Sequence, residues 1–178
     1  MPDWAKQFRR WIGTDKSASG PEMYRGLRAI PLELDLTTIH APAGEPWRGA
    51  AVAMMEIGMA KGVASFAAIA DGTVSMYTSV GGGVIGAGSH AAVRAAADQF
   101  RVAASESRTL LQRTQDFPLP QPGEIRFQAR TAEGGFTGAA AEQALRTGRH
   151  PLSPLYAAGQ DLVTEIRLST PETAFRPD

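Results

Sequence analysis

An Asp-Gly pair, Asp71-Gly72, separates two runs typical of β-strands, and this pattern restricts the fold more than any other segment. Residues 64–70 precede the pair and residues 73–80 follow it, and both runs are mostly apolar or β-branched. Asp-Gly is common in two-residue type I′ turns, where both central residues need a positive φ. The pattern predicts a β-hairpin. The expected cross-strand pairs are Ile69 with Val74, Ala67 with Met76, and Phe66 with Tyr77.

The stretch around this hairpin is poor in charge. Between Gly49 and Val93 the charged residues are Glu56, Lys61 and Asp71. Such a stretch is expected at the centre of a sheet, covered on at least part of both faces. The Ala and Met content of residues 49–57 favours a helix, but their length and the nearby glycines favour a strand, which we predict. Glu56 is placed at a strand end and gives no support to acid–base chemistry.

A glycine-rich run, residues 81–88, follows the hairpin and precedes a helical pattern. Ser89 is the predicted N-cap of a helix that extends to about Gln112. The spacing also fits a dinucleotide fingerprint, but the preceding strand belongs to a tight hairpin and not to a parallel βαβ unit. The run is therefore predicted to be a strand-to-helix corner. The alternative is a phosphate or carboxylate site formed by backbone N–H groups. Its residues would be Gly86, Ala87, Gly88, Ser89 and His90.

Further elements follow from hydrophobic periodicity. Leu32, Leu34 and Leu36 alternate with polar residues and predict a strand. Residues 124–131 predict a second one, with Ile125, Phe127 and Ala129 inward and Arg126, Gln128 and Arg130 outward. Its hairpin turns at residues 133–135 and ends near residue 140. A short helix is expected at 141–147, and Ser153-Pro154 forms a predicted N-cap and N1 pair for a last helix.

Two surfaces are candidates for partner contacts. Residues 3–13 predict an amphipathic helix on which Trp4, Phe8, Trp11 and Ile12 share one face. This helix would pack on its own subunit or a sister subunit; the alternative is a helix that docks a partner or lies on a membrane surface. Arg126 and Arg130 give one strand a basic face, which is either solvated or contacts an acidic partner segment.

The element order predicts an α+β fold, an antiparallel sheet built from a meander and a second hairpin with helices gathered on one face. By analogy it is profilin/roadblock-like, a class of adaptors and dimerisation platforms, although a fold does not fix a function. We expect an N-terminal amphipathic helix and linker at 1–20, a single α+β domain at 21–169 and a flexible tail at 170–178.

Composition excludes several function classes. The chain has 178 residues, no cysteine and a formal net charge of zero, so disulfides, thiol chemistry and thiolate metal sites are excluded and nucleic-acid binding is not favoured. No signal peptide or membrane span is predicted, and a cytoplasmic location is expected. His40, His90 and His150 lack metal-ligand spacing, so neither a metal nor another cofactor is predicted.

The residues from Asp71 to Gly88 carry a D-G-x-x-S-x-Y-x-S-x-G-G-G-x-I-G-x-G pattern, and residues 148–155 carry G-R-H-x-L-S-P-L. In both segments the chain resembles an uncharacterised group of bacterial proteins. The resemblance extends from about residue 25 onward. It implies no activity and no catalytic residue, and it favours a strand at residues 49–57.

No catalytic motif stands out, so the sequence predicts a non-enzymatic protein-interaction or adaptor module, expected as a homodimer. The alternative is a protein that binds a small anion, such as a nucleotide or phosphate, at the glycine-rich corner. A third hypothesis is an enzyme that uses His90 or His150, which would require their side chains to converge in one cleft.

Overall fold

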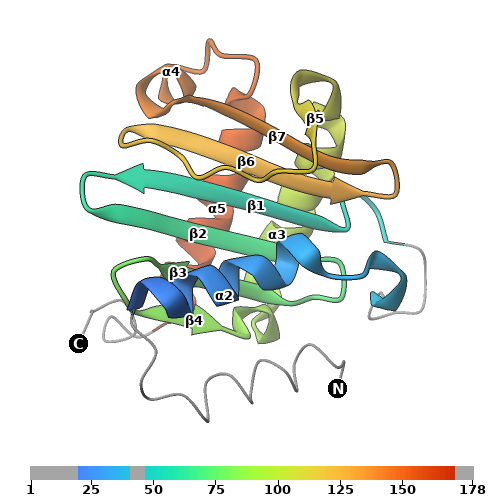
Figure 1. Cartoon of the computed structure of the whole chain (residues 1–178). Coiled ribbons are helices and arrows are strands. Elements are labelled where there is room, and N and C mark those ends of the chain that lie inside the picture. Colours follow the sequence, from blue (N-terminus) through green and yellow to red (C-terminus); the bar gives the residue numbers. More distant parts are fainter. Residues whose placement is uncertain (1–19, 41–46, 171–178) are drawn as a thin grey trace.

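The computed structural model describes residues 20–40 and 47–170. Within these residues the chain forms one antiparallel sheet with helices on both faces (Figure 1). This confirms the predicted α+β class, whereas the profilin/roadblock analogy stays a prediction. The predicted helix at 3–13, with Trp4, Phe8, Trp11 and Ile12, lies outside the described residues, as does the tail from residue 171.

The described sheet has seven strands in the order β4-β3-β2-β1-β6-β7-β5, and every neighbouring pair is antiparallel. The strand predicted at residues 49–57 is confirmed as β1, and the second predicted hairpin as β6 and β7. The bounds are β1 Val52–Met59, β2 Gly62–Ile69, β3 Val74–Thr78, β4 Gly83–Ile85, β5 Gln112–Thr114, β6 Glu124–Thr131 and β7 Gly134–Ala141.

The β2–β3 hairpin is confirmed, but its register is shifted by one residue from the predicted one. Phe66 pairs with Met76, and Ala68 pairs with Val74. The turn is not type I′, since Gly72 has φ +88° and no non-glycine residue in the described part has a positive φ. The Ile69 amide donates to the carbonyl of Thr73 at 2.9 Å, which closes a three-residue loop with its glycine in the left-handed region. That extra loop residue accounts for the shift.

The strand predicted from Leu32, Leu34 and Leu36 is wrong. The first described helix, α2, covers Gly20–Glu33, and a 3-10 turn, η1, covers Leu36–Thr38. The two-residue alternation occupies only the end of a longer helical pattern, in which Tyr24, Leu27 and Leu32 are buried on one face. Asp35 then begins η1 by accepting a hydrogen bond from the Thr37 amide at 2.9 Å.

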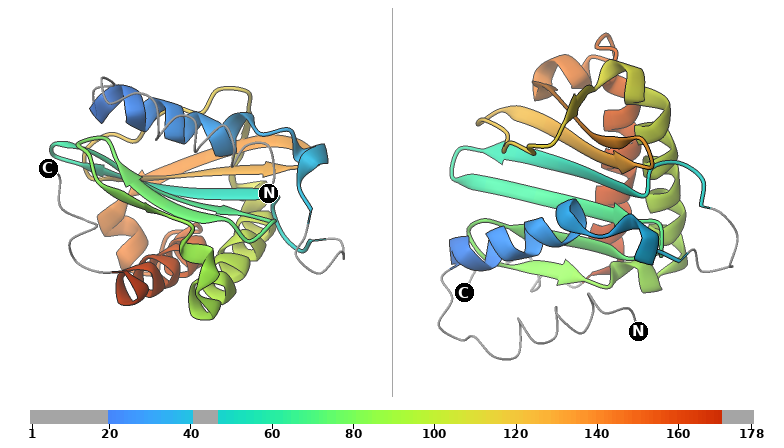
Figure 2. Two further views of the ribbon diagram at one scale, coloured as in Figure 1. Left: turned by 90° about the horizontal axis from the view of Figure 1, so that it is seen from below. Right: turned by 45° about the vertical axis from the view of Figure 1, so that its right-hand side comes forward.

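Helices cover both faces of the sheet. The prediction that they gather on one face is wrong. α3 (Ala91–Glu106) and α5 (Ser153–Ser169) lie on one face, and α2 crosses the other (Figure 2). Alternation along the strands therefore fills two cores. Met55, Phe66 and Phe127 belong to the α3–α5 side, and Met54 and Tyr77 belong to the α2 side. The strand face predicted to point outward from β6 is consequently turned toward α2, and Gln128 is buried there.

The glycine-rich run forms a corner between the sheet and α3, and it contains the short edge strand β4 and a 3-10 turn, η2 (Ala87–Ser89). The residue at the N-cap of α3 is His90, not Ser89, and its side chain forms no capping bond. The predicted extension of this helix to Gln112 is wrong. The helix ends at Glu106, a 3-10 turn η3 (Ser107–Leu110) follows, and Gln112 begins β5.

The C-terminal elements follow the prediction closely. α4 covers Glu142–Arg146, and α5 begins at Ser153 with Pro154 in its first turn. The residue at the N-cap of α5 is Leu152 and not Ser153. The Ser153 hydroxyl donates to the Leu145 carbonyl at 2.9 Å, so its side chain joins α5 to α4 and does not cap the helix.

None of the described helices is long and apolar enough to cross a membrane.

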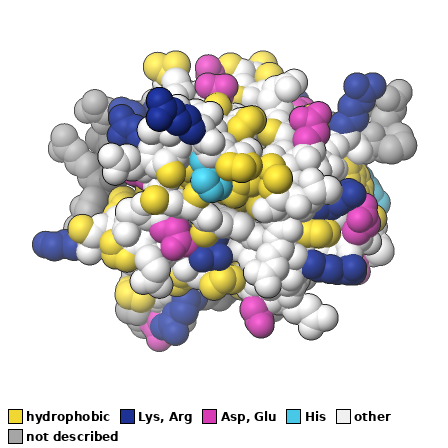
Figure 3. Space-filling model, turned by 90° about the horizontal axis from the view of Figure 1, so that it is seen from above, with side chains coloured by type: hydrophobic (Ala, Val, Ile, Leu, Met, Phe, Trp, Pro, Cys, Tyr) yellow, Lys and Arg dark blue, Asp and Glu magenta, His cyan; other side chains and the backbone are white. Residues whose placement is uncertain are grey.

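On the face over α4 and the β5 end, acidic and basic side chains are interspersed with apolar ones (Figure 3). This face therefore presents no broad patch of a single charge, in keeping with the zero net charge of the chain.

Candidate functional site

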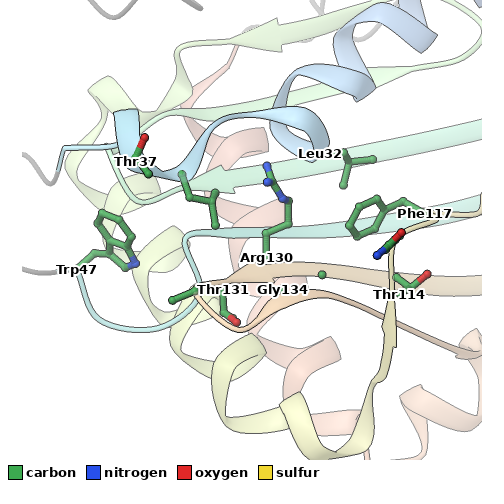
Figure 4. A pocket seen from close by; sticks show the side chains of 12 residues that line it. Leu32, Thr37, Trp47, Thr114, Phe117, Arg130, Thr131 and Gly134 are labelled. Atoms are coloured by element: carbon green, nitrogen blue, oxygen red, sulfur yellow. The ribbon is translucent and has the colours of Figure 1, made fainter.

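An open cavity of about 730 Å³ lies on the α2 side of the sheet. It is enclosed by the end of α2 with η1, by the β6–β7 turn and by the segment that follows β5 (Figure 4). A volume of this size falls within the roughly 300–1,000 Å³ typical of small-molecule sites. The lining residues are Leu32, Leu36, Thr37, Trp47, Thr114, Gln115, Phe117, Arg130, Thr131, Ala132, Gly134 and Gly135.

Arg130 projects from β6 into the middle of this cavity (Figure 4). Its Nη1 donates to the carbonyl oxygens of Pro31, at 3.3 Å, and Leu34. The last turn of α2 has no basic residue of its own, so Arg130 supplies the positive charge that favours a helix C-terminus. Nη2 and Nε of Arg130 form no hydrogen bond with any described group. These two donors are therefore free to bind a ligand.

The charge of Arg130 is not neutralised by a carboxylate in the described part of the chain. Its pKa is lowered by burial, and the charge of Asp35 acts in the opposite direction. A guanidinium still keeps its proton at neutral pH. The cavity thus holds a permanent positive charge among side chains that are otherwise apolar or uncharged.

Two aromatic side chains form opposite walls of the cavity, Trp47 on one side and Phe117 on the other (Figure 4). Phe117 can lie against β7 because residue 135 is glycine. A Cβ there would approach Phe117 Cζ to 2.7 Å and the Thr114 carbonyl oxygen to 2.8 Å. The absence of a side chain at Gly135 therefore sets the position of this wall.

A buried polar cluster lies beneath α2, centred on Glu56 of β1, whose exposed fraction is 0%. Arg28 of α2 binds its two oxygens, through Nε at 2.7 Å and Nη2 at 2.8 Å. Ser65 donates to Oε1 at 2.9 Å, and the Gln128 amide lies 3.1 Å from Oε2. The Tyr24 hydroxyl is 2.8 Å from the Ser65 hydroxyl. We name these five residues the Glu56 cluster.

The pKa values of two tyrosines are raised here, those of Tyr24 in the Glu56 cluster and of Tyr77, on which the Glu56 charge also acts. Burial, with the negative charge of Glu56, raises the pKa of Tyr24 to about 12. Burial raises the pKa of Tyr77 well above its ordinary value, and the Glu56 charge acts in the same direction. For Arg28, burial opposes the charged form, but the hydrogen bonds and attraction from Glu56 outweigh it, so its pKa is raised. Direct contacts with Glu56 therefore keep the Arg28 guanidinium charged despite its burial.

The Glu56 cluster also binds the backbone of the segment that carries the Phe117 wall of the cavity. Arg28 Nη2 donates to the carbonyls of Phe117 at 2.7 Å and Pro118 at 3.2 Å. Gln128 Nε2 donates to the same Pro118 carbonyl at 2.8 Å. The proline-rich segment 117–123 is not a strand of the sheet, and side-chain donors bind its backbone where it passes over β6.

At the glycine-rich corner, where an anion site is predicted, several backbone amides form hydrogen bonds within the protein. The amides of Gly86, Ser89 and His90 each donate to a backbone carbonyl oxygen at 3.1 Å. Ala87 and Gly88 are buried. A Cβ on Gly88 would lie 1.9 Å from a carbonyl oxygen of the β2–β3 turn, so this glycine permits close packing. Three of the five predicted donors are thus used within the corner, and a ligand there stays a prediction.

The histidines and the two predicted arginines lie in separate environments. His40 and His90 are exposed, and His150 accepts a hydrogen bond at Nδ1 from the Leu152 amide at 3.1 Å. Arg126 binds Glu124 at 2.7 Å, whereas Arg130 enters the cavity. Across residues 20–40 and 47–170, no cluster of three or more histidine and acidic side chains is arranged to hold a metal ion.

Sequence reasoning missed most of this site. Arg28 was not expected in a helix, and Trp47 and Phe117 lie in segments without a periodic pattern. One signal was present, because an acid inside a long uncharged run, such as Glu56, needs a buried partner.

Searches with the whole chain against protein-family models, curated proteins and solved structures gave no match.

Proposed function

We propose that this protein is a non-enzymatic binding module whose cavity takes a small apolar monocarboxylate. The observation that carries the proposal is the charge of Arg130, which has no carboxylate partner among the described residues and is surrounded by an apolar cavity. One guanidinium matches one carboxylate, because its planar pair of N–H groups can form two parallel bonds to the two oxygens. A phosphate dianion would keep one negative charge uncompensated in this cavity.

The rest of the lining suits the apolar body of such a ligand. Trp47 and Phe117 offer aromatic walls, and Leu32 and Leu36 close the side nearest α2. The other polar side-chain groups of the lining are threonine hydroxyls, one glutamine amide and the Trp47 indole N–H, which do not gain or lose protons near neutral pH. This chemistry supports binding and not acid–base catalysis.

A non-enzymatic binding module is also what the sequence predicts, but the anion site proposed here is the Arg130 cavity and not the glycine-rich corner. At the corner, three of the five predicted backbone amides already have partners, whereas Arg130 has two free donors. A protein-interaction role that depends on residues 3–13 stays a prediction, since those residues lie outside the described part of the chain.

Isothermal titration calorimetry with decanoate tests the proposal, with decanol as the uncharged control of equal chain length. Decanoate is expected to bind at least about tenfold more tightly than decanol, the gain typical of a charge-assisted bond. The variant Arg130→Met should remove this preference. Arg126→Met is the matched control, because Arg126 lies four residues away on the same face of β6 but does not line the cavity.

Two results would contradict the proposal. The first is no heat of binding with millimolar decanoate. The second is equal affinity for decanoate and decanol in the unaltered protein, which would show that Arg130 does not select an anion.

A further inference from the structure

We infer that Gln128 and Arg28 are positioning residues of the cavity, which act on a ligand through Phe117. The inference rests on the proposed function, because it concerns the affinity of the same cavity. Neither side chain lines the cavity. Both donate to the backbone that carries its aromatic wall.

The geometry places three hydrogen bonds on two consecutive carbonyl groups. Arg28 reaches the carbonyls of Phe117 and Pro118, and Gln128 reaches the carbonyl of Pro118. Pro118 has no N–H, so its backbone cannot donate a hydrogen bond to a neighbouring strand. The side-chain donors therefore fix the direction in which the Phe117 ring enters the cavity.

The donors are themselves fixed by Glu56. Its two carboxylate oxygens bind the Arg28 guanidinium and the Gln128 amide, and the carboxylate is fully buried. Because Arg28 lies on α2 and Gln128 on β6, the cluster sets the wall relative to two elements of the fold. A ring that is already oriented loses less conformational entropy on binding, which increases affinity.

Ser65 offers a matched control. Gln128→Met and Ser65→Ala each remove one hydrogen bond from the Glu56 carboxylate, but Gln128 alone of the two also binds the wall. We expect Gln128→Met to raise the Kd for decanoate about fivefold, the effect of one lost hydrogen bond. Ser65→Ala should leave the Kd within about twofold of the original value.

A double-mutant cycle with Phe117→Ala separates positioning from a general loss of stability. If Gln128 acts through the Phe117 ring, Gln128→Met should change the Kd little once that ring is absent. An equal change of Kd in both backgrounds would overturn the inference. If Gln128→Met does not fold, Arg28→Lys replaces it, because a single ammonium group cannot keep both the Glu56 and the wall contacts.

A ligand-free measurement distinguishes failure of this inference from failure of the proposed function. With 4-fluorophenylalanine at position 117, the ¹⁹F resonance should shift or broaden in Gln128→Met but not in Ser65→Ala. An unchanged resonance in Gln128→Met overturns the inference. Absence of decanoate binding with a shifted resonance overturns the proposed ligand and leaves the positioning role supported.

Discussion

Replacing Arg28 with methionine should strongly destabilise the protein, because it leaves the Glu56 carboxylate buried without a counter-charge. Glu56 has no exposed surface, and Arg28 supplies two of its hydrogen bonds, at 2.7 and 2.8 Å. Methionine can retain much of the packing of the arginine stem. The main loss is therefore electrostatic.

The expected cost can be worked out from these contacts. Breaking a buried ion pair by removing one partner costs about 3–5 kcal/mol. The two bonds from Arg28 to the Phe117 and Pro118 carbonyls add about 1 kcal/mol in total, since the first is only partly buried and the second is exposed. We expect a loss of about 4–6 kcal/mol, which is a large share of the roughly 5–15 kcal/mol that stabilises a typical domain.

Urea unfolding followed by circular dichroism measures this loss, with Arg25→Met as the control. Arg25 lies one turn earlier on α2, is exposed and binds the carbonyl of Pro21, so its removal should cost less than about 0.5 kcal/mol. Adding Glu56→Gln to Arg28→Met should restore about 2 kcal/mol, because an amide needs no counter-charge.

A stability loss in Arg28→Met no larger than that in Arg25→Met would refute this prediction. A further loss of stability when Glu56→Gln is added to Arg28→Met would refute it too, because the buried charge would then not be the source of the loss.

Two further measurements test other parts of the structure. The chain has three tyrosines, and burial raises the pKa of Tyr24, Tyr77 and Tyr156, so phenolate absorbance of the native protein should develop only above pH 10. Tyrosines of the unfolded chain lose their protons near pH 10, before those of the folded protein, so the free energy of unfolding should fall as the pH rises above about 10. A free energy of unfolding at about pH 11 equal to that at neutral pH would contradict the raised tyrosine pKa values. Gly88→Ala should lower the free energy of unfolding in urea by more than about 3 kcal/mol, because its Cβ would lie 1.9 Å from a backbone oxygen. At Gly148 a Cβ would have no atom within 4 Å, so Gly148→Ala should cost only about 1 kcal/mol, for the positive φ of that residue. Equal costs for the two glycines would refute the packing role of the corner.

The sheet was predictable where the local pattern was regular. The alternation of Ile125, Phe127 and Ala129 gave the correct buried face of β6, because side chains in a strand alternate between faces. The register of the β2–β3 hairpin was not predictable from its turn residues, since Asp-Gly fits both a two-residue and a three-residue loop. The choice between them depends on how both strands pack.

The end of α2 shows a different limit. Leu32, Leu34 and Leu36 satisfy the period of a strand over a short window, and only the longer pattern from Tyr24 indicates a helix. Once α2 lies on the sheet, Tyr24 and Leu27 are buried against it. The same packing buries Gln128, which a two-layer prediction placed on the outside.

The amino-acid sequence by itself determined the α+β class, the central hairpin and the last two helices, because these depend on local periodicity, turn residues and chain propensity. Only the tertiary structure decided that helices cover both faces, that Arg28 pairs with Glu56, and that Arg130 meets Trp47 and Phe117 around one cavity. The physical reason is separation along the chain. Arg130 binds carbonyls 96 and 99 residues away, and Arg28 reaches a carbonyl 89 residues away. Such contacts have no local periodicity, and they form only when layers of the fold are packed together.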